Sequence, residues 1–236
     1  MKDNLTELVF ILDRSGSMGG LESDTIGGYN AMLSKQKNQS GRAKVTTVLF
    51  DDEYELIHER LDIEKVEPIT EKQYFVRGTT ALLDAIGRTL SLMISISKTV
   101  NKDAKSKKVI FVITTDGMEN ASVEYSYKKI KKMIEYQKEK YGWEFIFLGA
   151  NIDAIDTAQR FGINKDMATN FKADSQGVSL NYEVVSEALT CFRSNKKMTK
   201  ELIDQITAYI KEDFSPEQTS ATLRIREDVN ISFVSI

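Results

Sequence analysis

Three short runs of apolar residues, each followed by polar residues, form the framework of this sequence. They cover residues 8–12, 109–113 and 145–148 and are rich in β-branched and aromatic side chains. Continuous apolar runs of this length are typical of strands that are buried on both faces. Such strands occur in parallel sheets between layers of helices, so the pattern predicts an α/β protein with a mainly parallel sheet.

Between and after these runs, apolar residues recur every three or four positions, as they do along the buried face of a helix. This spacing predicts helices near residues 22–40, 80–98, 123–141, 153–161 and 177–193. In the third of these helices, Val123, Tyr127, Ile130 and Ile134 are expected to face the core.

Two further strands are predicted at residues 45–50 and 54–60. Asp51, Asp52 and Glu53 connect them, and this link is short enough for a hairpin. The hairpin would supply one antiparallel edge strand, with the three carboxylates solvated at its tip.

The composition fits an intracellular globular protein. Of the 236 residues, 41% are apolar, which suffices for the core of one large domain with or without an extension. The single cysteine, Cys191, suits a reducing compartment, and the chain enters its first strand without a signal peptide, so a cytoplasmic location is expected. A net charge of −3 gives no general attraction to nucleic acid, and no apolar run is long enough to span a membrane.

Oxygen-bearing side chains follow two of the predicted buried strands. Asp13, Ser15 and Ser17 come directly after the first strand, at a spacing of two that lets a tight loop aim all three at one point. Asp116 follows the second strand, and Thr80 lies in a loop that opens a predicted helix. The carboxyl ends of parallel strands meet at one edge of a sheet, where ligands bind. Since hard oxygen donors suit Mg²⁺ or Mn²⁺, we predict a metal site at this edge.

These motifs resemble the metal-ion-dependent adhesion site of von Willebrand factor type A domains. The resemblance rests on Asp13-x-Ser15-x-Ser17, on a threonine loop at residues 78–86 and on Asp116 in a third loop. Within the threonine loop, the distance to Asp84-Ala85-Ile86 assigns the ligand role to Thr80 and not to Thr79. In style, the chain resembles the small intracellular bacterial members of this family more than its adhesion receptors.

The resemblance implies a fold, a site and a mode of action. The fold would be a doubly wound, mainly parallel sheet of about six strands with one antiparallel edge strand, in a domain over residues 1–195. Residues 196–236 would form a C-terminal extension with a helix and either a strand or a disordered tail. The site would hold Mg²⁺ or Mn²⁺ on Asp13, Ser15, Ser17, Thr80 and Asp116. Its hydroxyls would contact the metal directly or through water, its carboxylates mostly through water. An Asp or Glu of a partner protein would fill the open ligand position.

Other interpretations of the same residues stay open. Asp13 could be the nucleophile of a Mg²⁺-dependent phosphohydrolase on a Rossmann-like sheet, although such enzymes usually carry a second acid where Ser15 stands. A serine hydrolase fits less well, because the only histidine, His58, lies in the predicted edge strand and no Gly-x-Ser-x-Gly motif is present. A structural subunit with a closed metal site is a third possibility. We expect a protein-binding module without catalytic activity.

Two arginines flank the predicted site in the sequence. Arg14 lies between Asp13 and Ser15, and Arg77 comes shortly before Thr80. Each is expected either to contact the acidic group of the partner or to be a solvated surface arginine.

Overall fold

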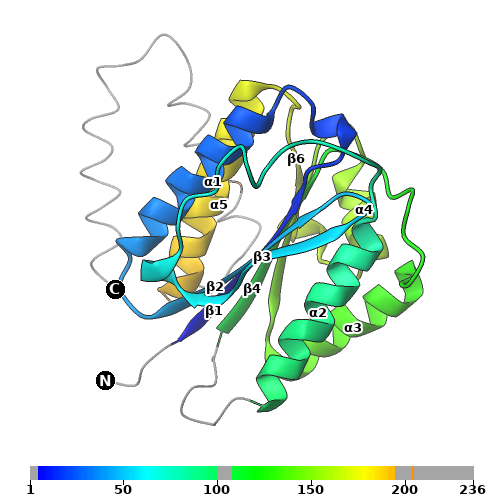
Figure 1. The fold of residues 1–236 in the computed structure, drawn as a ribbon. Coiled ribbons are helices and arrows are strands. Elements are labelled where there is room, and N and C mark those ends of the chain that lie inside the picture. Colours follow the sequence, from blue (N-terminus) through cyan, green and yellow to red (C-terminus); the bar gives the residue numbers. More distant parts are fainter. Residues whose placement is uncertain (1–4, 100–107, 195–203, 205–236) are drawn as a thin grey trace.

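The computed structural model describes residues 5–99 and 108–194, together with residue 204. These residues form one sheet of six strands in the order β3-β2-β1-β4-β5-β6 (Figure 1). The strands are β1 (Thr6–Asp13), β2 (Ala43–Phe50), β3 (Tyr54–Asp62), β4 (Lys108–Thr115), β5 (Glu144–Gly149) and β6 (Ala168–Asn170). Neighbouring strands are parallel except β2 and β3, which form the predicted hairpin. The predicted extension at 196–236 lies outside the described residues, apart from residue 204.

Helices cover both faces of the sheet, as Figure 1 shows. They are α1 (Glu22–Lys37), α2 (Leu82–Thr99), α3 (Tyr127–Tyr141), α4 (Ala154–Arg160) and α5 (Ser175–Arg193). Helices α1 and α5 pack side by side on one face, and α2 and α3 lie on the other. Single 3-10 turns occur at η1 (Gly16–Met18), η2 (Ile63–Lys65) and η4 (Lys165–Met167). The doubly wound, mainly parallel sheet with one antiparallel edge strand is therefore confirmed.

The core lies on both sides of the central strands β1 and β4. All eight residues of β1 are buried, because helices cover each face of that strand. In β4, Phe111 stacks on Trp143 and Phe145, with ring centroids 5.6 and 4.9 Å apart. The thiol of Cys191 is buried in α5. Within the part of the chain that the structure describes, no helix has the length and apolar character needed to cross a membrane.

The prediction for the start of α3 was wrong. The helix begins at Tyr127, where the side chain of Ser126 accepts a hydrogen bond from the backbone N–H of Lys129. Val123 precedes the helix and is 89% exposed, so it does not face the core. The backbone N–H groups of residues 123–125 instead donate to the carboxylate of Asp84 in α2. These bonds hold the segment as a loop and leave the side chain of Val123 in solvent.

Candidate metal centre

The predicted metal site lies where three loops meet at the carboxyl ends of β1 and β4. These strands are parallel neighbours with Leu12 opposite Thr114, so the chain leaves both at the same edge of the sheet. The loop before α2 reaches the same place, because the N–H of Gly16 donates to the carbonyl of Gly78 at 3.2 Å. Together the three loops carry all five predicted site residues, which are Asp13, Ser15, Ser17, Thr80 and Asp116.

Three hydroxyl groups from two loops form a continuous cluster. Thr80 Oγ1 donates to Ser15 Oγ at 3.0 Å, and the hydroxyls of Ser15 and Ser17 are 3.1 Å apart. Ser17 also donates to Oδ1 of Asp116 at 2.5 Å, which joins the third loop to the cluster. Ser15 and Thr80 are buried and Ser17 is exposed, so the cluster is open to solvent only on the side of Ser17.

The structure brings Thr80 into the cluster and leaves Thr79 outside it. Thr80 is 3% exposed, whereas Thr79 is exposed, and Thr79 donates its backbone N–H to Asp52. Asn120, in the loop after β4, pairs with the backbone of Thr80. Its Oδ1 accepts from the N–H of Thr80 at 2.9 Å, and its own N–H donates to the carbonyl of Thr80 at 3.0 Å. The sequence analysis missed this role of Asn120, because it depends on two loops 40 residues apart.

Both carboxylates of the cluster are buried. Oδ1 of Asp13 accepts from the N–H of Ser15 at 2.7 Å, and Oδ2 accepts from the hydroxyl of Thr115 at 2.5 Å. Burial raises the pKa of Asp13 to about 6, although hydrogen bonds from Thr115 and Ser15 lower it in part. Burial also raises the pKa of Asp116, against the hydrogen bond from Ser17. A cation beside these two groups would stabilise their charged forms.

The residues present fit a divalent cation with hard oxygen ligands. Oδ2 of Asp116 is buried and accepts no hydrogen bond from the described residues, so one charged oxygen has no partner. Gly117 leaves room beside it, since a Cβ there would lie 3.0 Å from Ser17 Oγ and 3.1 Å from Thr80 Oγ1. Two carboxylates would balance the charge of Mg²⁺ or Mn²⁺. Among the described residues, no three His, Cys, Asp or Glu side chains form a metal-binding group, so the hydroxyls would have to be ligands.

A group of charged residues surrounds Arg14, between Asp13 and Ser15, and the predictions for Arg14 and Asp51 were wrong. Arg14 is fully buried, and its Nε donates to Asp51 Oδ2 at 3.1 Å while Nη1 donates to Glu55 at 2.5 Å. Arg14 is therefore neither a surface residue nor a contact for a partner. Asp51 is also fully buried and is not solvated at the hairpin tip. One signal was available, because Asp51 directly follows three apolar residues at the end of a predicted strand, just as Asp13 follows an apolar run.

Arg77 lies closer to the surface and shares the same carboxylate. Its Nε donates to Asp51 Oδ2 at 2.6 Å, and its guanidinium also pairs with Glu53. Arg77 is thus a partly exposed arginine that already pairs with two carboxylates, and its contact with an acidic group of a partner stays a prediction.

The only histidine lies away from these loops. His58 is in the middle of β3, where it is buried and its Nδ1 is 3.1 Å from the hydroxyl of Thr47. Burial lowers the pKa of its imidazole. This is the packing histidine expected from the sequence.

Comparison with known proteins gives a likeness of fold only. No protein-family model and no curated protein sequence matches the chain. A von Willebrand factor type A structure from Catenulispora acidiphila has a TM-score of 0.53 at 12% identity, over 82% of this chain and 43% of that one. The manganese-loaded TRAP protein of Plasmodium vivax has a TM-score of 0.52 at 15% identity, over 76% and 72%.

A third solved structure is proximal thread matrix protein 1 from the mussel byssus, with a zinc-occupied MIDAS motif. Its TM-score is 0.52 at 14% identity, over 78% of this chain and 46% of that one. This chain thus spans less than half of the byssus protein and of the Catenulispora protein. These matches show that the chain has the fold of von Willebrand factor type A domains.

Proposed function

We propose that this protein is a metal-dependent binding module for other proteins. A divalent cation, Mg²⁺ or Mn²⁺, would be held by Asp13, Ser15, Ser17, Thr80 and Asp116, and an acidic side chain of a partner would complete its ligands. The observation that carries the proposal is the meeting of three loops in a hydroxyl cluster beside a buried, unpartnered oxygen of Asp116. The manganese and zinc present in two structures of the same fold support a divalent cation.

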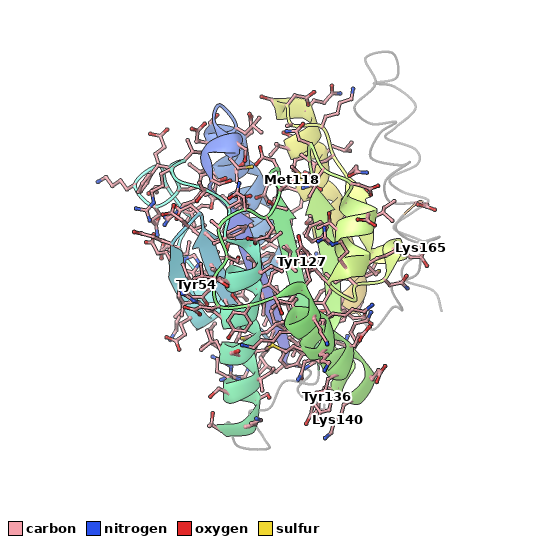
Figure 2. All side chains as sticks on the ribbon, turned by 90° about the vertical axis from the view of Figure 1, so that its right-hand side faces the viewer. Tyr54, Met118, Tyr127, Tyr136, Lys140 and Lys165 are labelled. Carbon is pink, nitrogen blue, oxygen red and sulfur yellow. The ribbon has the colours of Figure 1, made fainter. Side chains whose placement is uncertain are left out.

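The donor set favours an acidic partner group. Two carboxylates just balance the charge of a divalent cation. The hydroxyls are neutral and donate little electron density, so the bound cation would still attract one more charged oxygen. The loop after β4 reaches the solvent. Met118, two residues after Asp116, is 74% exposed and lies at the opposite end of the domain from Tyr136 and Lys140 (Figure 2). A partner could therefore approach this edge of the sheet.

We also propose that the chain catalyses no reaction. In the alternative, a phosphohydrolase, an oxygen of Asp13 would attack the substrate. Asp13 is 1% exposed, and each of its carboxylate oxygens accepts a hydrogen bond, from the backbone of Ser15 or the hydroxyl of Thr115. The attacking oxygen would have to turn from its hydrogen-bond donor toward the substrate, and burial would have to open before a substrate could reach it. The cytoplasmic location and the small intracellular bacterial type both stay predictions.

Calorimetry with Mn²⁺ tests the metal site first. The wild type and a Ser34→Ala variant should bind one Mn²⁺ per chain, because Ser34 is exposed on α1. A variant with Ser15→Ala and Ser17→Ala should lose this binding while its circular dichroism stays unchanged. Equal Mn²⁺ affinity in all three proteins would reject the site.

A second experiment tests the partner and the absence of catalysis. Proteins captured from an extract of the source organism in Mg²⁺ should be released by EDTA and should not bind the double serine variant. Phosphate and ester substrates should be hydrolysed no faster than in buffer. Turnover that is lost in Asp13→Asn would establish the phosphohydrolase instead.

A further inference from the structure

Asp51 contacts two of the three loops that would hold the metal, namely the serine loop after β1 and the threonine loop before α2. It directly follows β2, is fully buried, and its Oδ2 accepts hydrogen bonds from Nε of Arg14 at 3.1 Å and from Nε of Arg77 at 2.6 Å. Its backbone carbonyl accepts from the N–H of Ala81 at 2.8 Å. One residue therefore makes three contacts to the site loops, through its side chain and through its backbone.

Two of these three contacts lie next to a predicted metal ligand. Arg14 separates Asp13 from Ser15, and Ala81 follows Thr80. The two loops also bind each other directly, because the N–H of Arg77 donates to the carbonyl of Arg14 at 3.0 Å. The serine loop and the threonine loop therefore contact each other, and Asp51 binds to both of them at this place.

The charge of Asp51 is as important as its position. The guanidinium groups of Arg14 and Arg77 both lie over the ring of Phe75, 5.4 and 5.5 Å from its centroid. Arg14 is fully buried, and its Nη2 has no hydrogen-bond partner among the described residues. Each arginine pairs with one further glutamate, but the side chains of those glutamates are 49% and 67% exposed. If the carboxylate of Asp51 were neutral, Arg14 and Arg77 would lose the one buried carboxylate that they share, and the loops would be expected to separate. The loss of one negative charge beside the site would also weaken its attraction for a cation.

We propose that Asp51 is a positioning residue for the metal centre, which sets the distance between Ser15 and Thr80 by holding Arg14 and Arg77. This inference rests on the proposed metal site. Residues behind the ligands of a metal centre typically change metal affinity by about 10–100-fold when they are replaced. A loss in this range is expected for Asp51→Asn, which keeps the shape of the side chain and removes its charge.

The matched control is Glu7→Gln. Glu7 is also buried, also pairs with an arginine, Arg60 at 2.9 Å, and lies at the other end of β1. Both substitutions should lower the melting temperature. Only Asp51→Asn should weaken Mn²⁺ binding, by about 10–100-fold in calorimetry. An equal Mn²⁺ affinity in Asp51→Asn and Glu7→Gln would show that Asp51 is merely structural and would overturn the proposal.

Hydrogen exchange in the metal-free protein separates this proposal from the proposed function. Exchange should become faster in Asp51→Asn at the amides of Gly16, Arg77 and Ala81, and should stay unchanged in β4. Arg77→Gln, at a half-exposed site, should show a smaller change of the same kind even if Asp51→Asn fails to fold. A wild type without Mn²⁺ affinity would refute the metal site but leave the exchange test valid, whereas unchanged exchange in both variants would refute the positioning role.

Discussion

The hydroxyl of Thr115 donates a 2.5 Å hydrogen bond to Oδ2 of Asp13, across the two central strands of the sheet. Both residues are buried, and this bond is one of two that the carboxylate of Asp13 accepts. Burial raises the pKa of Asp13, and the bond from Thr115 is the largest of the effects that lower it. Thr115 therefore links the strand end that carries Asp13 to the loop that carries Asp116.

Replacement of Thr115 by valine should destabilise the fold. The substitution keeps the shape of the side chain and leaves a buried carboxylate oxygen without its donor, at a cost of about 1–3 kcal/mol in the free energy of unfolding. Thr114→Val is the control on the same strand, because the hydroxyl of Thr114 is buried and has no hydrogen-bond partner among the described residues. That variant should be as stable as the wild type or more stable. Urea denaturation measures both, and an equal loss in the two variants would contradict the assignment.

The two neighbouring threonines before α2 should differ in their effect on metal binding. Thr80→Ala removes a hydroxyl from the cluster with Ser15 and should weaken Mn²⁺ binding at least tenfold in calorimetry, on the scale of one lost charge-assisted contact. Thr79→Ala removes an exposed hydroxyl one residue away and should leave the affinity unchanged. If Thr79→Ala were the more damaging substitution, the loop would present the other threonine to the metal.

Much of the fold could be predicted because its signals are local. The strands β1, β4 and β5 are buried on both faces, so each appears in the sequence as an unbroken apolar run. The strand β6 could not be predicted in this way. It has only three residues, none of them fully buried, and it forms because β5 offers an edge for pairing. Val123 misled the analysis because its spacing is helical, whereas Asp84 binds the backbone of that segment.

The candidate site likewise has a part that could be predicted from the sequence and a part that could not. Asp13, Ser15 and Ser17 are neighbours in the sequence, and the carboxyl ends of parallel strands explain why Asp116 lies near them. The group formed by Arg14, Asp51 and Arg77 was not predictable from spacing, since its members are 37 and 26 residues apart. Charged residues in a short link are usually solvated, and only the tertiary structure shows that this carboxylate is buried between two guanidinium groups.

Two adjacent glycines of α1 should respond to alanine in opposite ways. A Cβ at Gly28 would lie 2.4 Å from the ring of Tyr182 in α5, so Gly28→Ala should destabilise the packing of α1 on α5 by about 1–3 kcal/mol. A Cβ at Gly27 would meet nothing within 4 Å, so Gly27→Ala should stabilise the helix by about 0.5–1 kcal/mol. Thermal and urea unfolding measure the difference. A stabilising Gly28→Ala would show that α5 lies farther from α1.

His58 should make the domain less stable on mild acidification, an effect opposite in sign to that of Asp13, whose pKa is raised to about 6. Burial lowers the pKa of His58 below its ordinary value of 6.5, so below that pH the unfolded chain binds a proton that the folded chain does not. The contribution of the neutral imidazole is thus complete above pH 6.5 and is lost as the pH falls further. His58→Asn keeps a polar partner for Thr47 and removes the titration. Since Asp13 and all other groups titrate in both proteins, the free energy of unfolding at pH 5.5 relative to pH 7.5 should be lower for the wild type than for the variant. Parallel losses in urea denaturation at the two pH values would mean that His58 takes up its proton without strain in the folded state.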